Sequence, residues 1–262
     1  MYSFESLFGN KPIIECDDYL NFLSKIPDSS VDVVISDPPF GVSYQNHHTH
    51  KKFDYIIGDK QKFSYAKLAK ECFRVLKPNT AFWLFTGYST YPDHYKDVKE
   101  AGFHLKEPLI CQKRPSGTND LYGSLQTNSD WVLFAHKGRF LFYETKLLRN
   151  KRAGTIPNRG GRPVKEFKTR FPSAWFGTEF PYSTENPALK IHHPTPKTVK
   201  FIRWLILLST AENAIVLDPF LGSGTTAIAS KLTNRRFIGC DIEQKFVDLA
   251  ISRLEQAKEE YK

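Results

Sequence analysis

The stretch VLDPFLGSGTTAIA, residues 216–229, joins an apolar run, an acid followed by proline, a glycine-rich turn and a second apolar run. This pattern predicts a buried strand, a tight loop containing Gly222 and Gly224, and a helix. The next apolar run, residues 235–241, ends in Asp241, at the place where nucleoside-binding α/β folds put an acceptor for ribose hydroxyls. The stretch therefore predicts an α/β fold that binds a nucleoside-containing cofactor.

Strands and helices alternate along most of the chain. We expect strands at 11–16, 31–36, 80–86, 103–113, 130–138, 213–220 and 235–241, and helices at 17–26, 64–76, 91–102, 195–210, 224–232 and 243–260. This alternation predicts a doubly wound, mostly parallel, seven-stranded Rossmann-like sheet. Residues 143–190 mix Pro, Gly, Arg and aromatic residues without a period, so we interpret them as an irregular insertion between two halves of one domain, 1–142 and 191–262.

Composition narrows the class of protein. The 262 residues carry a net charge of +9, and a basic surface favours a polyanionic partner such as nucleic acid. No apolar run reaches ~18 residues and no export signal is evident, so we expect neither a membrane span nor secretion. The four cysteines form no CxxC pair, which favours reduced thiols in the cytoplasm over disulfides or a zinc site.

The glycine loop could hold NAD or S-adenosylmethionine. Asp218 and Pro219 directly precede it, and an acid there attracts the ammonium of S-adenosylmethionine but repels a pyrophosphate. A phosphate loop of the Walker type is excluded because the required Gly-Lys-Ser/Thr is missing. The loop therefore favours S-adenosylmethionine.

A second motif, Asp-Pro-Pro-Phe at residues 37–40, follows the expected strand 31–36. The exocyclic amino group of a base is a poor nucleophile because its lone pair is delocalised into the ring. The Asp37 carboxylate and the Pro38 carbonyl could accept its two hydrogens, while Pro39 stiffens the backbone and Phe40 offers a face for a flipped base. The motif therefore predicts in-line methyl transfer to an amino group.

The tetrapeptide followed by the loop DPFLGSGTT resembles the amino-group DNA methyltransferases, and the motif order resembles their β class. The resemblance implies that Asp17 contacts the cofactor adenine and Asp241 the ribose. It also implies that Thr195 and Lys197, in HHPTPKT at 192–198, lie near the methionine carboxylate. The expected cofactor-binding set is Asp17, Thr195, Lys197, Asp218, Pro219, Phe220, Gly222, Ser223, Gly224, Thr225, Thr226 and Asp241.

The same resemblance implies double-stranded DNA as the substrate, with the target base flipped out of the helix. Asp at the first tetrapeptide position is similar to adenine-N6 enzymes, whereas Ser is usual in cytosine-N4 enzymes. Residues 41–62 and the insertion 143–190, which matches the target-recognition region by position, supply the expected DNA contacts: Tyr44, Lys51, Lys52, Arg152, Arg159, Arg162 and Arg170. The chemistry needs no metal at His47, His48 and His50.

Several hypotheses fit these motifs. The expected function is a sequence-specific, adenine-N6 DNA methyltransferase of a restriction-modification system, with a homodimer and a cognate restriction endonuclease as partners to be tested. The alternatives are a cytosine-N4 enzyme, an RNA or protein-amide methyltransferase, and an NAD-dependent oxidoreductase. A catalytically dead methyltransferase fold that only binds nucleic acid would not need both Asp37 and Asp218.

Overall fold

The computed structural model describes residues 9, 11–39, 63–112, 129–143, 174–175 and 197–257. Within them the helices are α2 (Tyr19–Ser24), α3 (Tyr65–Val75), α4 (Tyr91–Glu100), α5 (Val199–Ser209), α6 (Thr225–Leu232) and α7 (Gln244–Gln256). The strands are β1 (Ile13–Cys16), β2 (Val31–Ser36), β3 (Leu76–Thr86), β4 (His104–Leu105), β5 (Leu109–Gln112), β6 (Ser129–Lys137), β7 (Ala174–Trp175), β8 (Ile215–Asp218) and β9 (Arg236–Asp241).

These strands form one mixed sheet in the order β1-β9-β8-β2-β3-β6-β5-β7, with β4 also paired to β6. The strands from β1 to β3 in that order are parallel, whereas β6 runs antiparallel to both β3 and β5. The seven strands of four or more residues are those predicted, and β7 is a two-residue addition. The doubly wound, mostly parallel Rossmann-like sheet is therefore confirmed, but it has nine strands instead of the predicted seven, because β4 is separate from β5 and β7 is added.

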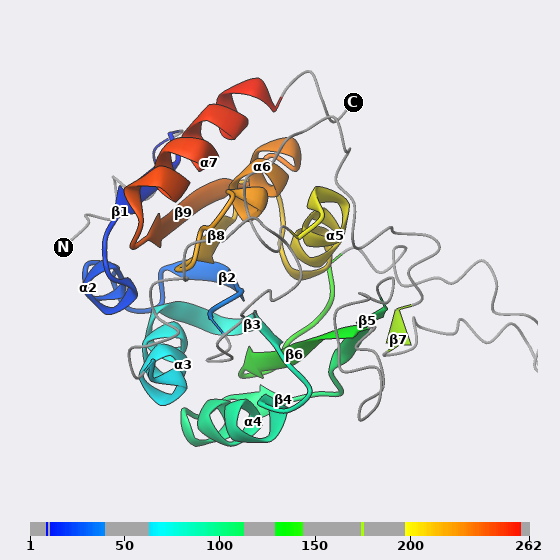
Figure 1. The fold of residues 1–262 in the computed structure, drawn as a ribbon. Coiled ribbons are helices and arrows are strands. Elements are labelled where there is room, and N and C mark those ends of the chain that lie inside the picture. Colours follow the sequence, from blue (N-terminus) through cyan, green and yellow to red (C-terminus); the bar gives the residue numbers. More distant parts are fainter. Residues whose placement is uncertain are drawn as a thin grey trace, which may run out of the picture.

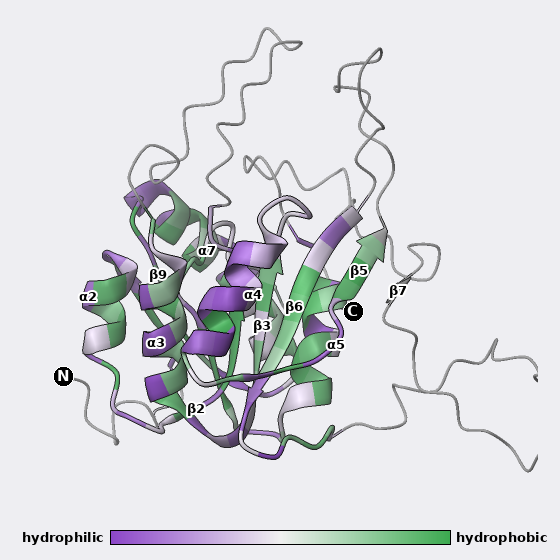
Figure 2. Ribbon diagram, turned by 90° about the horizontal axis from the view of Figure 1, so that it is seen from below, coloured by the Kyte–Doolittle hydropathy of each residue, from purple (hydrophilic) through white to green (hydrophobic). Residues whose placement is uncertain are grey.

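Helices cover both faces of the sheet, with α5, α6 and α7 on one side and α2, α3 and α4 on the other (Figure 1). Strand β2 shows why: Val33 and Ile35 pack on the first side, whereas Val34 packs on the second. Continuous apolar runs are expected for parallel strands buried on both faces. Figure 2 shows β5 and the middle of β6 coloured hydrophobic and most of α4 coloured hydrophilic. In the described part of the chain, no helix has the length and apolarity that crossing a bilayer requires.

Three predicted boundaries were wrong. The strand expected at 80–86 begins earlier: β3 starts at Leu76, directly after α3 ends at Val75, and includes Lys77, Pro78 and Asn79. Val31 pairs with Leu76, and Val33 pairs with Ala81. An advance of two residues along β2 therefore corresponds to an advance of five along β3, and the extra residues of β3 form a bulge. Asn79 adopts a positive φ of 66° in this bulge, a conformation that Asn tolerates better than most residues.

The expected strand 103–113 is split into β4 and β5. Leu105 pairs with Ala135, and Leu109 pairs with Val132. An advance of four residues from β4 to β5 therefore corresponds to three residues along β6. The additional residue lies beside Pro108, which has no N–H to donate to the ladder. Helix α5 also begins at Val199, four residues later than predicted.

Candidate active site

The two sequence motifs meet at the centre of the sheet. Strand β8 ends at Asp218, and Asp37 directly follows its parallel neighbour β2, in a register that pairs Val34 with Leu217. From β8 the chain winds through α6 to β9 on one side, and from β2 it winds through α3 to β3 on the other. This reversal is the topological switch point, where open α/β sheets bind their ligands beyond the carboxyl ends of the strands.

Lys197 and Asp37 form an ion pair in this region. Lys197 Nζ donates to Asp37 Oδ2 at 2.5 Å, and the lysine side chain is only 10% exposed. Burial acts to lower the pKa of Lys197, but the carboxylates of Asp37 and Asp130 outweigh it and raise that pKa above its usual value. Lys197 therefore stays charged and fixes one carboxylate oxygen of Asp37.

The rest of the tetrapeptide lies against α3. Pro38 is buried and Pro39 half-buried, and the Pro39 carbonyl accepts a 2.7 Å hydrogen bond from Tyr65 Oη. Sequence reasoning did not single out Tyr65, because a tyrosine at the start of an amphipathic helix carries no signal of its own. Phe40 lies outside the described residues.

Asp218 is a buried acid whose carboxylate accepts two hydrogen bonds. Its Oδ1 accepts from the Phe220 backbone N–H at 3.0 Å, and its Oδ2 accepts from Thr226 Oγ1 at 2.6 Å. Burial raises the pKa of Asp218 to about 8, and the nearby Asp37 and Asp241 carboxylates act in the same direction. An ammonium group placed against this carboxyl would stabilise its ionised form, so Asp218 fits a cationic ligand.

The glycine loop is held by Asp241 at the end of β9. Gly222 and Gly224 adopt positive φ values of 50° and 78°, and the Gly222 N–H donates to Asp241 Oδ2 at 2.8 Å. Burial raises the pKa of Asp241. Thr225 Oγ1 donates to the backbone carbonyl of Lys197 at 3.2 Å, so the loop is also connected to the ion pair at Asp37.

Asp17 lies beside Asp241 at the same edge. Its N–H donates to the Asp241 carbonyl at 3.0 Å, and its carboxylate pairs with Lys25 at 2.7 Å. The hydrogen bond from Lys25 lowers the pKa of Asp17. The helix cap is Asp18, whose Oδ1 accepts from Leu20 N–H at 2.9 Å, which leaves Asp17 outside the helix.

The structure thus brings Asp17, Asp37, Asp218 and Asp241, with Lys197 and the glycine loop, to one edge of the sheet. Residues Tyr44, Lys51, Lys52, Arg152, Arg159, Arg162, Arg170 and Thr195, and the insertion 143–190 apart from Tyr143, Ala174 and Trp175, lie outside the described residues. In the part of the chain that the structure describes, no three His, Cys, Asp or Glu side chains are grouped to hold a metal ion.

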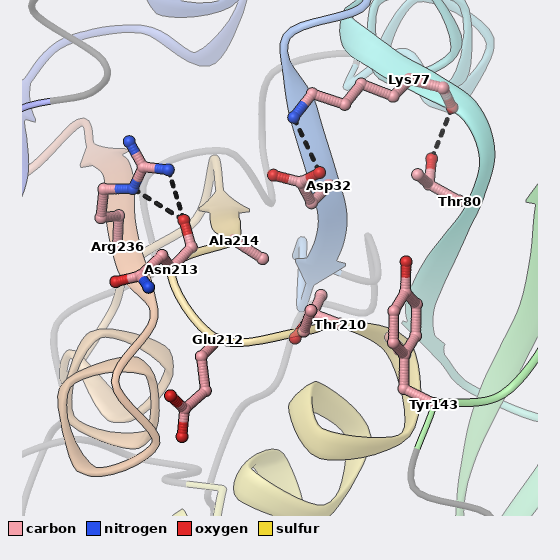
Figure 3. Close-up of a pocket in the computed structure, with 11 residues that line it drawn as sticks. Asp32, Lys77, Thr80, Tyr143, Thr210, Glu212, Asn213, Ala214 and Arg236 are labelled. Atoms are coloured by element: carbon pink, nitrogen blue, oxygen red, sulfur yellow. Dashed lines mark hydrogen bonds and ion pairs between the residues drawn. The ribbon is translucent and has the colours of Figure 1, made fainter.

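A pocket at the opposite edge carries no comparable chemistry (Figure 3). Three of its charged groups, Asp32, Lys77 and Arg236, already serve the fold. Lys77 pairs with Asp32 at 2.8 Å, Asp32 Oδ2 accepts from the Ile215 N–H, and Arg236 donates twice to the Asn213 carbonyl. These bonds join the starts of the strands, so the candidate site lies at the opposite, carboxyl edge.

Comparison with known proteins agrees with this geometry. Residues 31–252 match the DNA methylase family N6_N4_Mtase, a span that contains the tetrapeptide, the glycine loop and Asp241. The chain belongs to this family. The predicted amino-group methyltransferase class and its methyl donor, S-adenosylmethionine, are thereby confirmed.

The methylase is similar to a relative and to two solved structures over most of its length. It is 29% identical to the Type II methyltransferase M2.DpnII from Streptococcus pneumoniae, over 95% of this chain and 92% of the relative. TTHA0409 from Thermus thermophilus, solved with S-adenosyl-L-methionine, superposes with a TM-score of 0.64 at 20% identity, over 96% of both chains. The cytosine-N4-specific PvuII DNA methyltransferase superposes with a TM-score of 0.66 at 17% identity, over 95% of this chain and 90% of that chain.

Proposed function

We propose that this methylase transfers a methyl group from S-adenosylmethionine to adenine N6 in a specific sequence of double-stranded DNA. The observation that carries the proposal is the juxtaposition at the switch point: Asp37, held by Lys197, lies beside the strand that ends in Asp218. The preference for adenine rests on Asp37 at the first tetrapeptide position. Membership of the methylase family leaves the oxidoreductase hypothesis without support.

The cofactor, when bound, supplies an electrophilic methyl group on a sulfonium. Asp218 provides the carboxylate for its ammonium, and Asp241 and Asp17 provide acceptors at the ends of the next two strands, β9 and β1. The positive φ of Gly222 shapes the turn between the Asp218 and Asp241 segments.

Asp37 and the Pro38 carbonyl then act on the amino group of the flipped base. Both accept its hydrogens, which draws the nitrogen lone pair out of the ring and towards the methyl group. The Asp37 carboxylate also stabilises the positive charge that develops on that nitrogen, and this charge stabilisation needs no prior deprotonation. Lys197 holds the carboxylate in its ionised, acceptor form.

DNA recognition is assigned to segments outside the described residues. We retain 143–190 as the target-recognition region. We also retain as DNA contacts the basic and aromatic residues that were named in this region and in residues 41–62. A cognate restriction endonuclease fits the Type II designation of the relative, and a homodimer remains a second prediction. The cytoplasm is the proposed compartment, since the four cysteines are all thiols and DNA is the substrate.

Nucleoside analysis tests the function. The purified chain is incubated with S-adenosylmethionine and duplex DNA, and the DNA is then digested and analysed by mass spectrometry. The proposal predicts N6-methyldeoxyadenosine. Detection of N4-methyldeoxycytidine would replace the proposed function by the cytosine-N4 function. Methylation of RNA or protein but not of DNA would contradict the proposed function.

A further inference from the structure

Tyr65 contacts the catalytic tetrapeptide from another element. It is the first residue of α3, where Ser64 is the N-cap, and its hydroxyl donates to the Pro39 carbonyl at 2.7 Å. This hydrogen bond ties the tetrapeptide to the start of the helix that follows it in the sequence.

The Tyr65 ring is itself held on two sides. It stacks on the imidazole of His94, with ring centres 3.5 Å apart and planes at 25°, and it meets the Phe63 ring edge-on at 4.7 Å and 86°. His94 is buried in α4, and its Nδ1 lies 2.6 Å from Thr86 Oγ1 at the end of β3. Burial lowers the pKa of His94 to about 4, so the stacked ring stays neutral near pH 7.

The backbone between Pro39 and Pro38 transmits this restraint. The ring of Pro39 fixes its φ, and the peptide unit that contains the Pro38 carbonyl is planar. The remaining soft torsion between the two carbonyls is ψ of Pro39, and the hydrogen bond from Tyr65 sets it. Holding the Pro39 carbonyl therefore also sets the direction of the Pro38 carbonyl.

We propose that Tyr65 is a positioning residue for methyl transfer: anchored by His94 and Phe63, its hydroxyl sets the direction in which the Pro38 carbonyl meets the target amino group. This inference rests on the proposed function. It assigns Tyr65 an effect on the chemical step and none on cofactor binding, since Tyr65 acts on the tetrapeptide rather than on Asp218 or Asp241.

The test compares Tyr65→Phe with Tyr19→Phe. Tyr19 is a matched control because its ring contacts Phe63 and Phe220 in the same aromatic group, but its hydroxyl meets the Ser64 carbonyl at 3.5 Å instead of the tetrapeptide. Single-turnover methylation, equilibrium binding of S-adenosylmethionine, thermal unfolding and hydrogen exchange of a peptide covering residues 31–40 are measured for each variant.

Tyr65→Phe is expected to slow single-turnover methylation by roughly tenfold, the order expected for one lost hydrogen bond, and to speed exchange in the 31–40 peptide. Cofactor affinity should change less than about twofold, and Tyr19→Phe should match the wild type in all four measurements. Unchanged exchange and rate in Tyr65→Phe, or equal losses in both variants, would overturn the inference. A wild type that methylates no DNA would refute the proposed function. Hydrogen exchange would still report on the contact between Tyr65 and the tetrapeptide in that case.

Discussion

Lys197 and Asp37 lie 160 residues apart in the sequence, yet Lys197 Nζ and Asp37 Oδ2 are 2.5 Å apart. The resemblance had placed Lys197 near the methionine carboxylate of the cofactor. In the structure its ammonium pairs with the acid that is proposed to activate the amino group, and the role near the methionine carboxylate stays a prediction. Because Thr225 also binds the Lys197 carbonyl, this lysine links the tetrapeptide to the helix that follows the glycine loop.

Replacing Lys197 with Gln should slow methyl transfer by about 10- to 100-fold, the range expected when a charge-assisted hydrogen bond to the Asp37 carboxylate is lost. Affinity for S-adenosylmethionine, measured by calorimetry, should change much less than the single-turnover rate. Lys99→Gln is the control, because Lys99 is exposed near the end of α4, away from this edge. If the Lys197→Gln variant loses cofactor affinity but keeps its turnover at saturating cofactor, Lys197 acts on the methionine carboxylate and the prediction is contradicted.

Cofactor binding should depend on the ionisation of Asp218. The carboxyl is largely protonated below its pKa of about 8, whereas the ammonium of the cofactor requires the carboxylate, so binding releases a proton. Affinity should therefore rise between pH 6 and 7.5, by roughly tenfold per pH unit. Asp218→Asn should bind the cofactor weakly and without this dependence. Calorimetry in two buffers of different ionisation enthalpy measures the proton directly, and equal heats in both buffers would contradict the prediction.

Gly224→Ala should destabilise the fold. An added Cβ would lie 2.6 Å from the Ala250 Cβ on α7, and φ is +78°, so the substitution combines overpacking with a left-handed backbone. We expect a loss of about 2–4 kcal/mol in the free energy of unfolding, measured by urea denaturation. Gly87→Ala is the control, since the added Cβ would come no closer than 3.5 Å to the nearest side chain. A loss in Gly224→Ala as small as that in Gly87→Ala would contradict the prediction.

The sequence predicts what short-range patterns encode. Apolar periodicity located the seven main strands and six helices, and the order of the two motifs located Asp37 and Asp218 at strand ends that the parallel sheet must bring to one edge. Boundaries failed where register decides them. Lys77, Pro78 and Asn79 follow the end of α3 as a bulge within β3 and not as a loop before it, and this depends on pairing with β2, which no local pattern reveals.

Contacts between distant segments were also beyond the sequence. The ion pair of Lys197 with Asp37 and the contacts of Tyr65 with Pro39 and His94 arise from packing of separate elements onto the sheet. Tyrosine and histidine at these positions read as ordinary helix residues, because their roles depend on what faces them. The resemblance singled out Lys197 for the cofactor but did not indicate its pairing with Asp37. The structure also shows that Asp18, not Asp17, caps α2.

Long-read sequencing of DNA from cells that express either the wild type or Asp37→Ala tests the central claim most directly. The account predicts N6-methyladenine within one sequence motif for the wild type and none for Asp37→Ala, while the purified variant binds S-adenosylmethionine as the wild type does. Methylation retained by Asp37→Ala, or a modified base other than adenine in the wild type, would contradict it.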